Sequence, residues 1–492
     1  MTIPKPSQVF RSIVRFYIDA RKEGKIPFLI VFAIALYVPF EEFIIKWLPA
    51  AVLLRFLPEL ILYGLLAKVI GQRVKSHTLR ATPIDLLILM FFLSAILSAV
   101  LNKSSLFGSI ESLRALWRYL SVFYFVVNIE ISLDQLLLII NSIRIAGLIQ
   151  GFLASIQYFM PASIQQVFAP SEFEFGDYQR ASPTEEGRLK IGSAFGTFSG
   201  PAVLCAFLLI ALLLSISHFY ASPSQTSIQY KNLIGLAAIS FGIFASKKRA
   251  PLLLAFVVPA MFMFFQKRIR GLLRLGWVLT VVIFLSILLL AFLGTNVDTS
   301  FTAFDEREQS IDLASYLLQV FDPEYWEESS ENSRGWVVIT IFRTLFSANP
   351  WFGFGPDLEN MRTIMAEILV NGRDRAKIIE IGPIEDVYWM VMLGYYGLIG
   401  IGIYALIIWR LFRAGKWLTR FSSQPEYKML GSMFCTFIVI TVFYNFIERA
   451  FKLRAFSFYF WLFSGLVINT YNTHRLRISK IDNFHASDLS QY

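Results

Sequence analysis

The sequence predicts an all-α, polytopic integral membrane protein with about 12 transmembrane helices and one large extra-cytoplasmic loop. Three observations predict this fold class. Hydrophobic residues make up 56% of the chain and charged residues only 16%, a balance typical of membrane proteins rather than soluble ones. The apolar residues fall in long blocks, and a transmembrane helix needs ~20 mostly apolar residues. Finally, the connectors rich in Lys and Arg fall on one side of the bilayer when twelve spans are counted.

The apolar blocks give the order of the expected spans. They are Pro27–Trp47, Ala50–Ile70, Ile84–Leu101, Leu113–Ile131, Leu136–Phe159, Phe198–Phe219, Asn232–Ala245, Ala250–Gln266, Gly276–Gly294, Val387–Phe412, Met429–Ile447 and Phe451–Tyr471. The predicted divisions are a basic cytoplasmic N-terminus (1–26), spans one to nine with an outer loop at 160–197 (27–294), a large outer loop (295–386), spans ten to twelve (387–471) and a cytoplasmic tail (472–492).

Clusters of Lys and Arg in the connectors set the orientation, because cytoplasmic connectors carry an excess of these residues. After the basic N-terminus, the clearest clusters are Arg73/Lys75/Arg80, Lys267/Arg268/Arg270/Arg274, Arg410/Arg413/Lys416/Arg420 and Arg475/Arg477/Lys480. Both termini are therefore expected in the cytoplasm, with Met160–Thr197 and Thr295–Asp386 outside. The formal net charge of +10 has this topological meaning and does not indicate a nucleic-acid partner.

The N-terminal segment shows no pattern of a cleavable signal peptide, so we expect the first span to act as its own insertion signal. Apolar residues between Val9 and Tyr17 recur at helical spacing, which suits a helix in the inner headgroup layer as well as a solvated basic tail. Cys205 and Cys435 both lie inside apolar blocks. This excludes a disulfide framework or a cysteine-based metal site.

One basic cluster breaks the positive-inside pattern. Lys247, Lys248 and Arg249 are separated from the cluster beginning at Lys267 by a single apolar block, so both clusters cannot be cytoplasmic. The downstream cluster is larger and fits the overall topology, which leaves 247–249 outside, at the N-terminus of the eighth span. Unpaired backbone N–H groups and the helix dipole add to the positive potential there. An anion is the expected ligand.

Other basic residues extend this outer set. Arg188 and Lys190 lie in the smaller outer loop, and Arg334 and Arg343 lie in the large one. Headgroup contact or a solvated surface explains any one of them equally well. The group as a whole favours a phosphate-bearing ligand, because the planar guanidinium binds phosphate oxygens bidentately and stays charged.

A helical reading of Ser333–Phe346 separates two of these candidates, since Arg334 and Arg343 are ~180° apart at ~100° per residue. Arg334 falls in an apolar stripe, and Arg343 lies on the side of two threonines. The stripe comprises Val338, Ile341 and Leu345, and the threonines are Thr340 and Thr344. A guanidinium on an apolar stripe needs a partner or must snorkel, so Arg334 is the better ligand-binding candidate.

Four stretches carry short motifs in sequence. Arg188–Pro201 contains Arg, Gly-Thr-Phe and Pro ahead of an apolar block, and Ser246–Ala250 contains Ser-x-x-Arg. Ser333–Trp336 contains Arg-x-Trp and is followed by Pro350–Gly355, which reads Pro-x-x-Gly-x-Gly; Asp386–Gly400 leads back into an apolar block. In order and spacing around one large outer loop, these stretches resemble the O-antigen polymerase and O-antigen ligase superfamily of bacterial surface-polysaccharide enzymes.

The resemblance implies a C-type membrane glycosyltransferase in the bacterial cytoplasmic membrane. Such an enzyme takes a glycan from an undecaprenyl-diphosphate donor on the outer face and joins it to an acceptor hydroxyl, with inversion and with no metal or other cofactor. It also implies chain-length regulator and flippase proteins as partners. By the resemblance, Arg249 and Arg334 bind the diphosphate, with Arg188, Arg343 and Lys248 as weaker additions. Preorganised cations stabilise the charge that the leaving diphosphate gains.

One departure concerns the catalytic base. Ligases of the family carry a His-Asn pair before the returning span, whereas this chain reads Glu385-Asp386. A carboxylate with a raised pKa near the bilayer can act as the base, and an acidic residue here shifts the reading from ligase toward polymerase. Helix N-capping by Asp386 is an equally good explanation, compatible with the first. Tyr388 adds either a sugar contact or a member of an aromatic belt.

Further polar residues lie in the expected spans and in the large loop. Arg55 and Glu59 are four apart on the second span, a spacing that favours a structural ion pair over a proton path. Arg144 lies well inside the fifth span. The acidic run Asp305–Glu308 fits a solvated face better than a metal site.

The leading hypothesis for function is a polysaccharide polymerase, which transfers the growing chain to the terminal sugar of a new lipid-linked repeat unit. The alternative within the family is a ligase that moves the finished glycan to a lipid or protein acceptor. The alternative from another class is a transporter or flippase of the same anionic lipid-linked glycans; the large outer loop does not favour it, and no duplicated halves are apparent.

Overall fold

The computed structural model describes residues 25–47, 51–159, 168, 173–175, 178–180, 193–221, 226–266, 303–304, 310–311, 334–368 and 387–489. Within these ranges the protein is helical except for two small antiparallel pairs of strands, β1 (Phe173–Phe175) with β2 (Tyr178–Arg180) and β3 (Ala303–Phe304) with β4 (Ser310–Ile311). The predicted helical class is confirmed for the described part of the chain. The predicted ninth span, Gly276–Gly294, lies outside it.

The helices follow the predicted apolar blocks closely. They are α2 (Ile26–Tyr37), η1 (Val38–Phe40), α3 (Glu41–Lys46), α4 (Ala51–Lys75), α5 (Asp85–Leu101), α6 (Leu106–Trp117), α7 (Leu120–Asn128), α8 (Leu133–Phe159), α10 (Pro201–Ala221), α11 (Thr226–Ala245), α12 (Arg249–Gln266), α16 (Arg334–Ala348), α17 (Leu358–Ile368), α19 (Tyr388–Phe421), α20 (Pro425–Ile447), η4 (Ala450–Lys452) and α21 (Arg454–Leu489).

Five helical segments among the described residues are long and apolar enough to cross a membrane. They are Ile26–Lys46, Leu133–Phe159, Pro201–Tyr220, Tyr388–Phe421 and Pro425–Ile447. Four shorter apolar helices, at Asp85–Leu101, Asn232–Ala245, Ala250–Gln266 and Val338–Ala348, accompany them. The protein is therefore a helical membrane protein by length and composition.

The surface of α5 shows how such a helix meets lipid. Its outer face exposes a continuous apolar stripe at helical spacing, formed by Leu86, Leu89, Leu93, Ile96, Leu97 and Val100. The opposite face, with Phe91, Ala95 and Ser98, is fully buried. Water would disfavour an apolar stripe of this length, whereas the hydrocarbon of a bilayer accommodates it.

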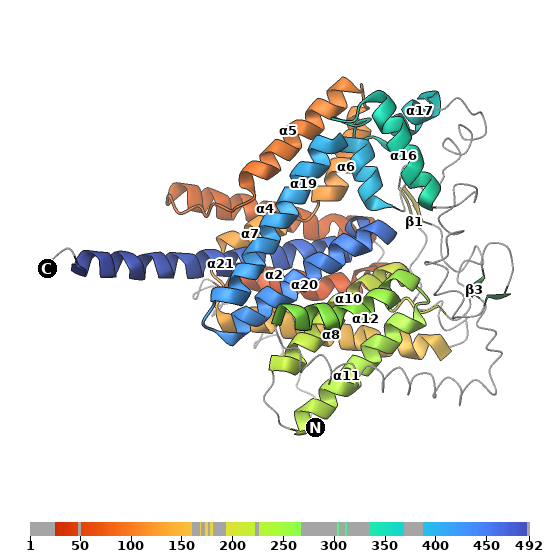
Figure 1. Ribbon diagram of the computed structural model, residues 1–492. Coiled ribbons are helices and arrows are strands. Elements are labelled where there is room, and N and C mark those ends of the chain that lie inside the picture. Colours follow the sequence, from red (N-terminus) through yellow and green to blue (C-terminus); the bar gives the residue numbers. More distant parts are fainter. Residues whose placement is uncertain are drawn as a thin grey trace.

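The bundle is built around neighbouring long helices. Helix α19 packs against α20 and α5, α8 packs against α10 and α11, and α21 packs against α7. Trp461 on α21, Trp117 on α6 and Tyr404 on α19 meet in a buried aromatic centre, with ring centroids 5.4 Å (Trp117–Trp461) and 5.8 Å (Trp117–Tyr404) apart. Figure 1 shows α16 and α17 at one edge of the bundle, while the end of α21 projects from the opposite side.

The fourth predicted span, Leu113–Ile131, is not one continuous helix. Helix α6 ends at Trp117 and α7 begins at Leu120. The break occurs at Arg118, whose guanidinium Nε lies 3.4 Å from a carboxylate oxygen of Glu59 and whose carbonyl accepts a 3.3 Å hydrogen bond from the Tyr63 hydroxyl. Partners on α4 satisfy the charge and the freed carbonyl, which lets an apolar helix break inside the bundle.

Glu59 is the centre of a buried ion cluster that joins four elements. Its carboxylate lies 2.9 Å from Arg114, 3.4 Å from Arg118 and 3.6 Å from Arg454. Arg454, at the start of α21, also lies 3.0 Å from Glu41 on α3. The sequence predicted a pair between Arg55 and Glu59 along one helix; the side chain of Arg55 lies outside the described part, and the ion pairs of Glu59 in the structure run to other helices.

Arg144 has a simpler environment. Its guanidinium donates a 3.1 Å hydrogen bond to the side-chain oxygen of Asn232 on α11. This contact joins α8 to α11 and gives the arginine, deep in a predicted span, a polar partner.

Candidate functional site

The predicted site residues fall in three groups. Arg188, Glu385 and Asp386 lie outside the described residues. Arg249 begins α12 and Arg334 begins α16, with their side chains likewise outside. Lys248 and Arg343 are described completely, and Lys248 is half-buried whereas Arg343 is exposed.

The first two motif stretches lie side by side. The N–H of Ala194 donates a 2.9 Å hydrogen bond to the carbonyl of Ala245, the last residue of α11. One turn into α10, the Cys205 thiol lies 2.5 Å from the hydroxyl of Ser246. The loop that follows Arg188 in the sequence therefore contacts the Ser-x-x-Arg turn directly.

Two glutamines on α8 position this loop, and both are fully buried. The side-chain oxygen of Gln157 accepts hydrogen bonds from the backbone N–H groups of Phe195 (3.1 Å) and Gly196 (2.7 Å). Its side-chain NH₂ group donates to the backbone carbonyl of Gly196 at 2.8 Å. The side-chain oxygen of Gln150 accepts from the backbone N–H of Thr197 at 3.1 Å, and its side-chain NH₂ group donates to the Thr197 hydroxyl at 2.6 Å. Backbone without secondary structure is thereby satisfied inside the bundle.

These glutamines were not identified as site residues from the sequence. Gln150 and Gln157 are seven residues apart and so share one face of α8. That spacing was the available signal. Polar side chains of this kind inside a span usually bond to another element.

The basic turn has a defined backbone. Lys247 adopts a left-handed conformation, with φ of 55°, and the Ser246 hydroxyl donates to the carbonyl of Ile243 at 2.7 Å and accepts from the N–H of Lys248 at 3.4 Å. The ammonium of Lys247 lies 5.9 Å from the centre of the Tyr158 ring, a cation–π distance. Helix α12 begins at the next residue but one, so its free N–H groups and the basic side chains share one end of the helix.

The connector between α20 and α21 lies at the same end of the bundle. The side chain of Gln266, the last residue of α12, donates a 2.5 Å hydrogen bond to Ser432 near the start of α20. Helices α12 and α20 pack against each other and run antiparallel. From the Gln266–Ser432 contact, α12 runs back about 17 residues to Arg249, and α20 runs forward about 16 residues to Glu448. Both distances are ~25 Å, so the two residues lie at the same level. The charges of Lys248 and Glu448 both act on the Cys205 thiol.

Glu448 and its neighbours were also missed from sequence. Glu448 and Arg449 fall between the last two predicted spans, and Lys452 and Arg454 lie in the first turn of the last one. By the predicted topology this connector is outside, so it carries outer positive charge for the same reason as the Lys247–Arg249 cluster. The positive-inside rule, applied to this connector as it was to Lys247–Arg249, identifies it from the sequence.

The third and fourth motif stretches also meet. The N–H of Phe354 donates to the carbonyl of Gly394 at 2.7 Å and that of Gly355 to Tyr395 at 3.2 Å; in return Leu398 donates to Pro350 at 2.9 Å. This exchange occurs where α19 breaks at Gly397, with φ of 63° and ψ of −169°. The Pro-x-x-Gly-x-Gly turn thus supplies the backbone hydrogen bonds that α19 lacks at this break.

Residues at the end of α5 fix the same turn. Asp357 accepts from the hydroxyl and the N–H of Ser105, at 2.6 and 3.1 Å. The Asn360 amide donates to the carbonyls of Asn102 (3.1 Å) and Phe354 (3.0 Å). The turn is consequently part of the bundle and not a separate loop.

Helix α16 confirms part of the helical reading. Ile341 and Leu345 are fully buried, so the apolar stripe that Arg334 shares by spacing faces the bundle. The prediction that Arg343 lies on the side of Thr340 and Thr344 is wrong, because both threonines are buried whereas Arg343 is exposed. Thr344 satisfies its hydroxyl by donating to the Thr340 carbonyl at 2.7 Å, which is how a threonine fits a buried helix face.

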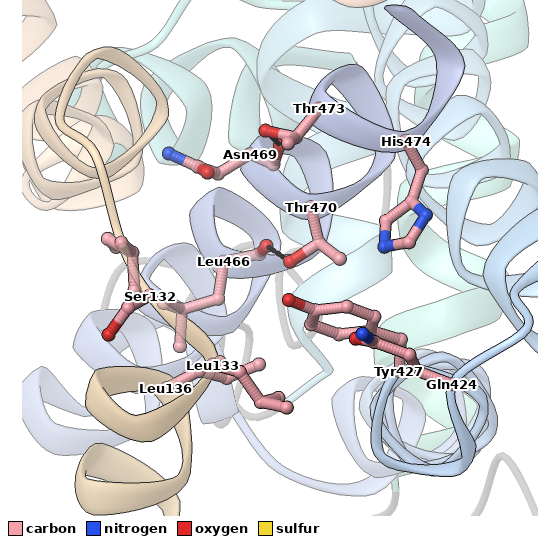
Figure 2. A pocket seen from close by; sticks show the side chains of 11 residues that line it. Ser132, Leu133, Leu136, Gln424, Tyr427, Leu466, Asn469, Thr470, Thr473 and His474 are labelled. Carbon is pink, nitrogen blue, oxygen red and sulfur yellow. Dashed lines mark hydrogen bonds between the residues drawn. The ribbon is translucent and has the colours of Figure 1, made fainter. Parts of the chain in front are cut away.

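A cavity of about 310 Å³ lies at the opposite end of α20 from Glu448 (Figure 2). It is formed by the beginnings of α8 and α20 and by α21, with Gln424, Tyr427 and His474 on one side and Leu133 and Leu136 on another. The Tyr427 and His474 rings are 4.7 Å apart. Its position separates this cavity from the basic turn.

Among the described residues, no group of three or more His, Cys, Asp or Glu side chains is arranged to bind a metal ion. The acidic run Asp305–Glu308 lies outside those residues. In sequence, the chain matches no family model and no curated protein. The geometry and the motif pattern are therefore the basis for any functional assignment.

Proposed function

We propose that this protein is a membrane glycosyltransferase that polymerises polyprenyl-diphosphate-linked repeat units into a surface polysaccharide. In this proposal twelve spans place the large loop, the Lys247–Arg249 turn and the α20–α21 connector on the outer face of a bacterial cytoplasmic membrane. Donor and acceptor are both lipid-linked, and transfer needs no metal.

The observation that supports the proposal best is the hydrogen bond from Ala194 to Ala245. It joins the stretch after Arg188 to the turn that contains Lys248 and Arg249, two motifs about fifty residues apart that the resemblance assigns to one diphosphate site. The buried glutamines of α8 make that junction rigid. A rigid array of cations suits a transition state in which the diphosphate gains charge.

The roles follow from this placement. Arg249, supported by Lys248 and the N-terminus of α12, binds the diphosphate. Arg334, which shares the spacing of the apolar stripe of α16, binds it from the large loop, and Arg188 and Arg343 contribute less. The shared binding of one ligand by Arg249 and Arg334 is a prediction of the proposal.

The catalytic base in this scheme is a carboxylate where the chain returns to the membrane, at Glu385 or Asp386. Two residues after Asp386, the buried Tyr388 begins α19, and its ring lies 5.5 Å from that of Phe451 in η4. The returning chain therefore enters the bundle beside the α20–α21 connector. This places the start of α19 at the same end of the bundle as the basic turn.

Reconstitution with a defined lipid-linked repeat unit tests the proposal. A ladder of lengthened lipid-linked chains is the expected product. Transfer of the glycan to a different lipid or protein acceptor would instead establish a ligase. Passage of unchanged substrate across the bilayer would establish a transporter, and either result would overturn the polymerase assignment.

A further inference from the structure

Lys248, just before α12, and Glu448, just after α20, carry opposite charges at the same end of these two packed helices and do not form an ion pair with each other. Lys248 and Glu448 both act electrostatically on the Cys205 thiol. Both side chains are half-buried. Within the described part of the chain, neither the ammonium of Lys248 nor the carboxylate of Glu448 makes a hydrogen bond or an ion pair.

The fully buried carboxylates of the bundle, Glu41 and Glu59, are paired instead. Glu59 contacts three guanidiniums and Arg454 contacts two carboxylates. A half-buried carboxylate costs free energy unless something compensates it. Two unpaired charges of opposite sign suit a substrate with two polar groups. The ammonium can bind an anionic group, and the carboxylate can accept a hydrogen bond from a hydroxyl group.

The backbone around Glu448 is held in place. Glu448 leaves α20 in an extended conformation, and its N–H donates to the carbonyl of Tyr444 at 2.8 Å. The side chain of Asn445 then accepts from the N–H of Phe451 at 3.2 Å and donates to the carbonyl of Thr441 at 2.8 Å. Asn445 and Tyr444 are fully buried. The carboxylate therefore projects from a short connector that is tied to α20 at both ends.

We propose that Glu448 is a catalytic residue, the carboxylate that accepts the proton of the acceptor hydroxyl while Lys248 faces the leaving diphosphate. This inference rests on the proposed function. The hydroxyl oxygen bonds to the anomeric carbon of the donor sugar, and the bond from that carbon to the diphosphate oxygen breaks. The electron pair of that bond stays on the diphosphate, and the hydroxyl proton passes to a Glu448 oxygen. No other reactant is needed.

The assignment explains how the chain works without the histidine of the related ligases. A general base has to lie within reach of the attacking hydroxyl and opposite the leaving group. Glu448 is level with the start of α12, where the diphosphate is proposed to bind. In this role Glu448 replaces Glu385 and Asp386, the carboxylates that the motif pattern suggests.

The test compares Glu448→Gln with wild type in the reconstituted full-length protein. Two quantities are measured, the rate of chain elongation and the affinity for undecaprenyl diphosphate in nanodiscs. We expect elongation to fall ~10²–10⁴-fold, the usual contribution of a general base, while the affinity stays within about twofold because Gln keeps the shape of the side chain. Glu448→Asp should restore part of the rate.

Glu426→Gln is the matched control, since Glu426 lies in the first turn of the same helix at its other end. It should elongate chains at the wild-type rate. Elongation by Glu448→Gln at more than half the wild-type rate would overturn the inference, and so would equal losses of elongation and of diphosphate affinity. If Glu448→Gln unfolds, a Glu448→Ala protein that is folded and fully active overturns it as well.

The failure of this inference is distinguishable from failure of the proposed function. A wild-type protein that elongates no chain removes both. A wild-type protein that elongates chains, together with an equally active Glu448→Gln variant, removes only the role of Glu448. In that case, inactive Glu385→Gln or Asp386→Asn proteins would return the base to the start of α19.

Discussion

The N–H of Phe354 donates a 2.7 Å hydrogen bond to the carbonyl of Gly394. Phe354 belongs to a turn within the proposed large outer loop, and Gly394 belongs to a helix apolar enough to span a membrane. The carbonyls of residues just before the Gly397 break lack the usual partner four residues on. The turn supplies that partner, so the break and the turn depend on each other.

The first prediction concerns Gly397. Its φ of 63° with ψ of −169° suits glycine alone, and a Cβ there would lie 2.6 Å from the N atom of Gly353. Gly397→Ala should lower the free energy of unfolding by roughly 2–4 kcal/mol, the combined cost of strain and displaced backbone. Thermal unfolding in detergent measures it. Gly402→Ala is the control, because nothing lies within 4 Å of a Cβ there; equal stability of the two variants would contradict the role of the break.

The second prediction concerns Gln157. Gln157→Leu removes three hydrogen bonds to a buried loop and leaves N–H and carbonyl groups unsatisfied, which should cost roughly 2–4 kcal/mol. Because the loop contacts the basic turn, elongation should fall as well. Ser155→Ala serves as the comparison, since that hydroxyl bonds only within its own helix, to Gly151 at 2.7 Å. An unchanged melting temperature for Gln157→Leu would be inconsistent with the structure.

The third prediction concerns the ion cluster. Glu59→Gln leaves Arg114, Arg118 and Arg454 without their shared carboxylate and should destabilise the protein by about 3–5 kcal/mol. Glu130→Gln should change stability by less than about 1 kcal/mol, because Glu130 is 84% exposed and 3.9 Å from Arg73. Chemical unfolding of both variants in the same detergent gives the comparison, and similar values would contradict a structural role for the cluster.

The fourth prediction concerns the proposed diphosphate site. Arg249→Ala and Arg334→Ala should each abolish elongation and weaken binding of undecaprenyl diphosphate at normal expression levels, because each removes a bidentate phosphate partner. Arg343→Ala should have a smaller effect, since Arg343 is exposed. Arg420→Ala, near the end of α19, is the control for general loss of positive charge. Normal activity of both principal variants would remove the assignment.

The fifth prediction concerns metal ions. Chain elongation should continue at the same rate after EDTA treatment, because the proposed diphosphate is neutralised by guanidinium and ammonium groups. Loss of elongation that Mn²⁺ or Mg²⁺ restores would contradict this and direct attention to Asp305–Glu308.

The apolar blocks predicted the helices well because burial in lipid requires long apolar segments. The breaks were harder. Arg118 and Gly397 interrupt apolar blocks, and their effect depends on partners far away in the sequence, Glu59 in one case and the Pro350–Gly355 turn in the other. Periodicity along one segment carries no information on such partners.

Only part of the candidate site could likewise be predicted from local sequence. The basic turn was predictable because its three adjacent cations are separated from another basic cluster by a single apolar block. Gln150, Gln157 and Glu448 were not identified, although each was visible as a polar residue within or beside an apolar block. Their importance lies in contacts with the loop at 193–200 and with α12, which only a three-dimensional arrangement provides.

The buried glutamines of α8 also bear on how the protein is made. Helix α8 leaves the ribosome before the loop at 193–200 has been synthesised, so Gln150 and Gln157 enter the bilayer without the backbone groups that they bond in the finished protein. Each unpaired amide in hydrocarbon costs free energy. Helix α8 should therefore stay beside the insertion machinery until α10 arrives, which makes this pair of helices, and not a single span, the unit of membrane insertion.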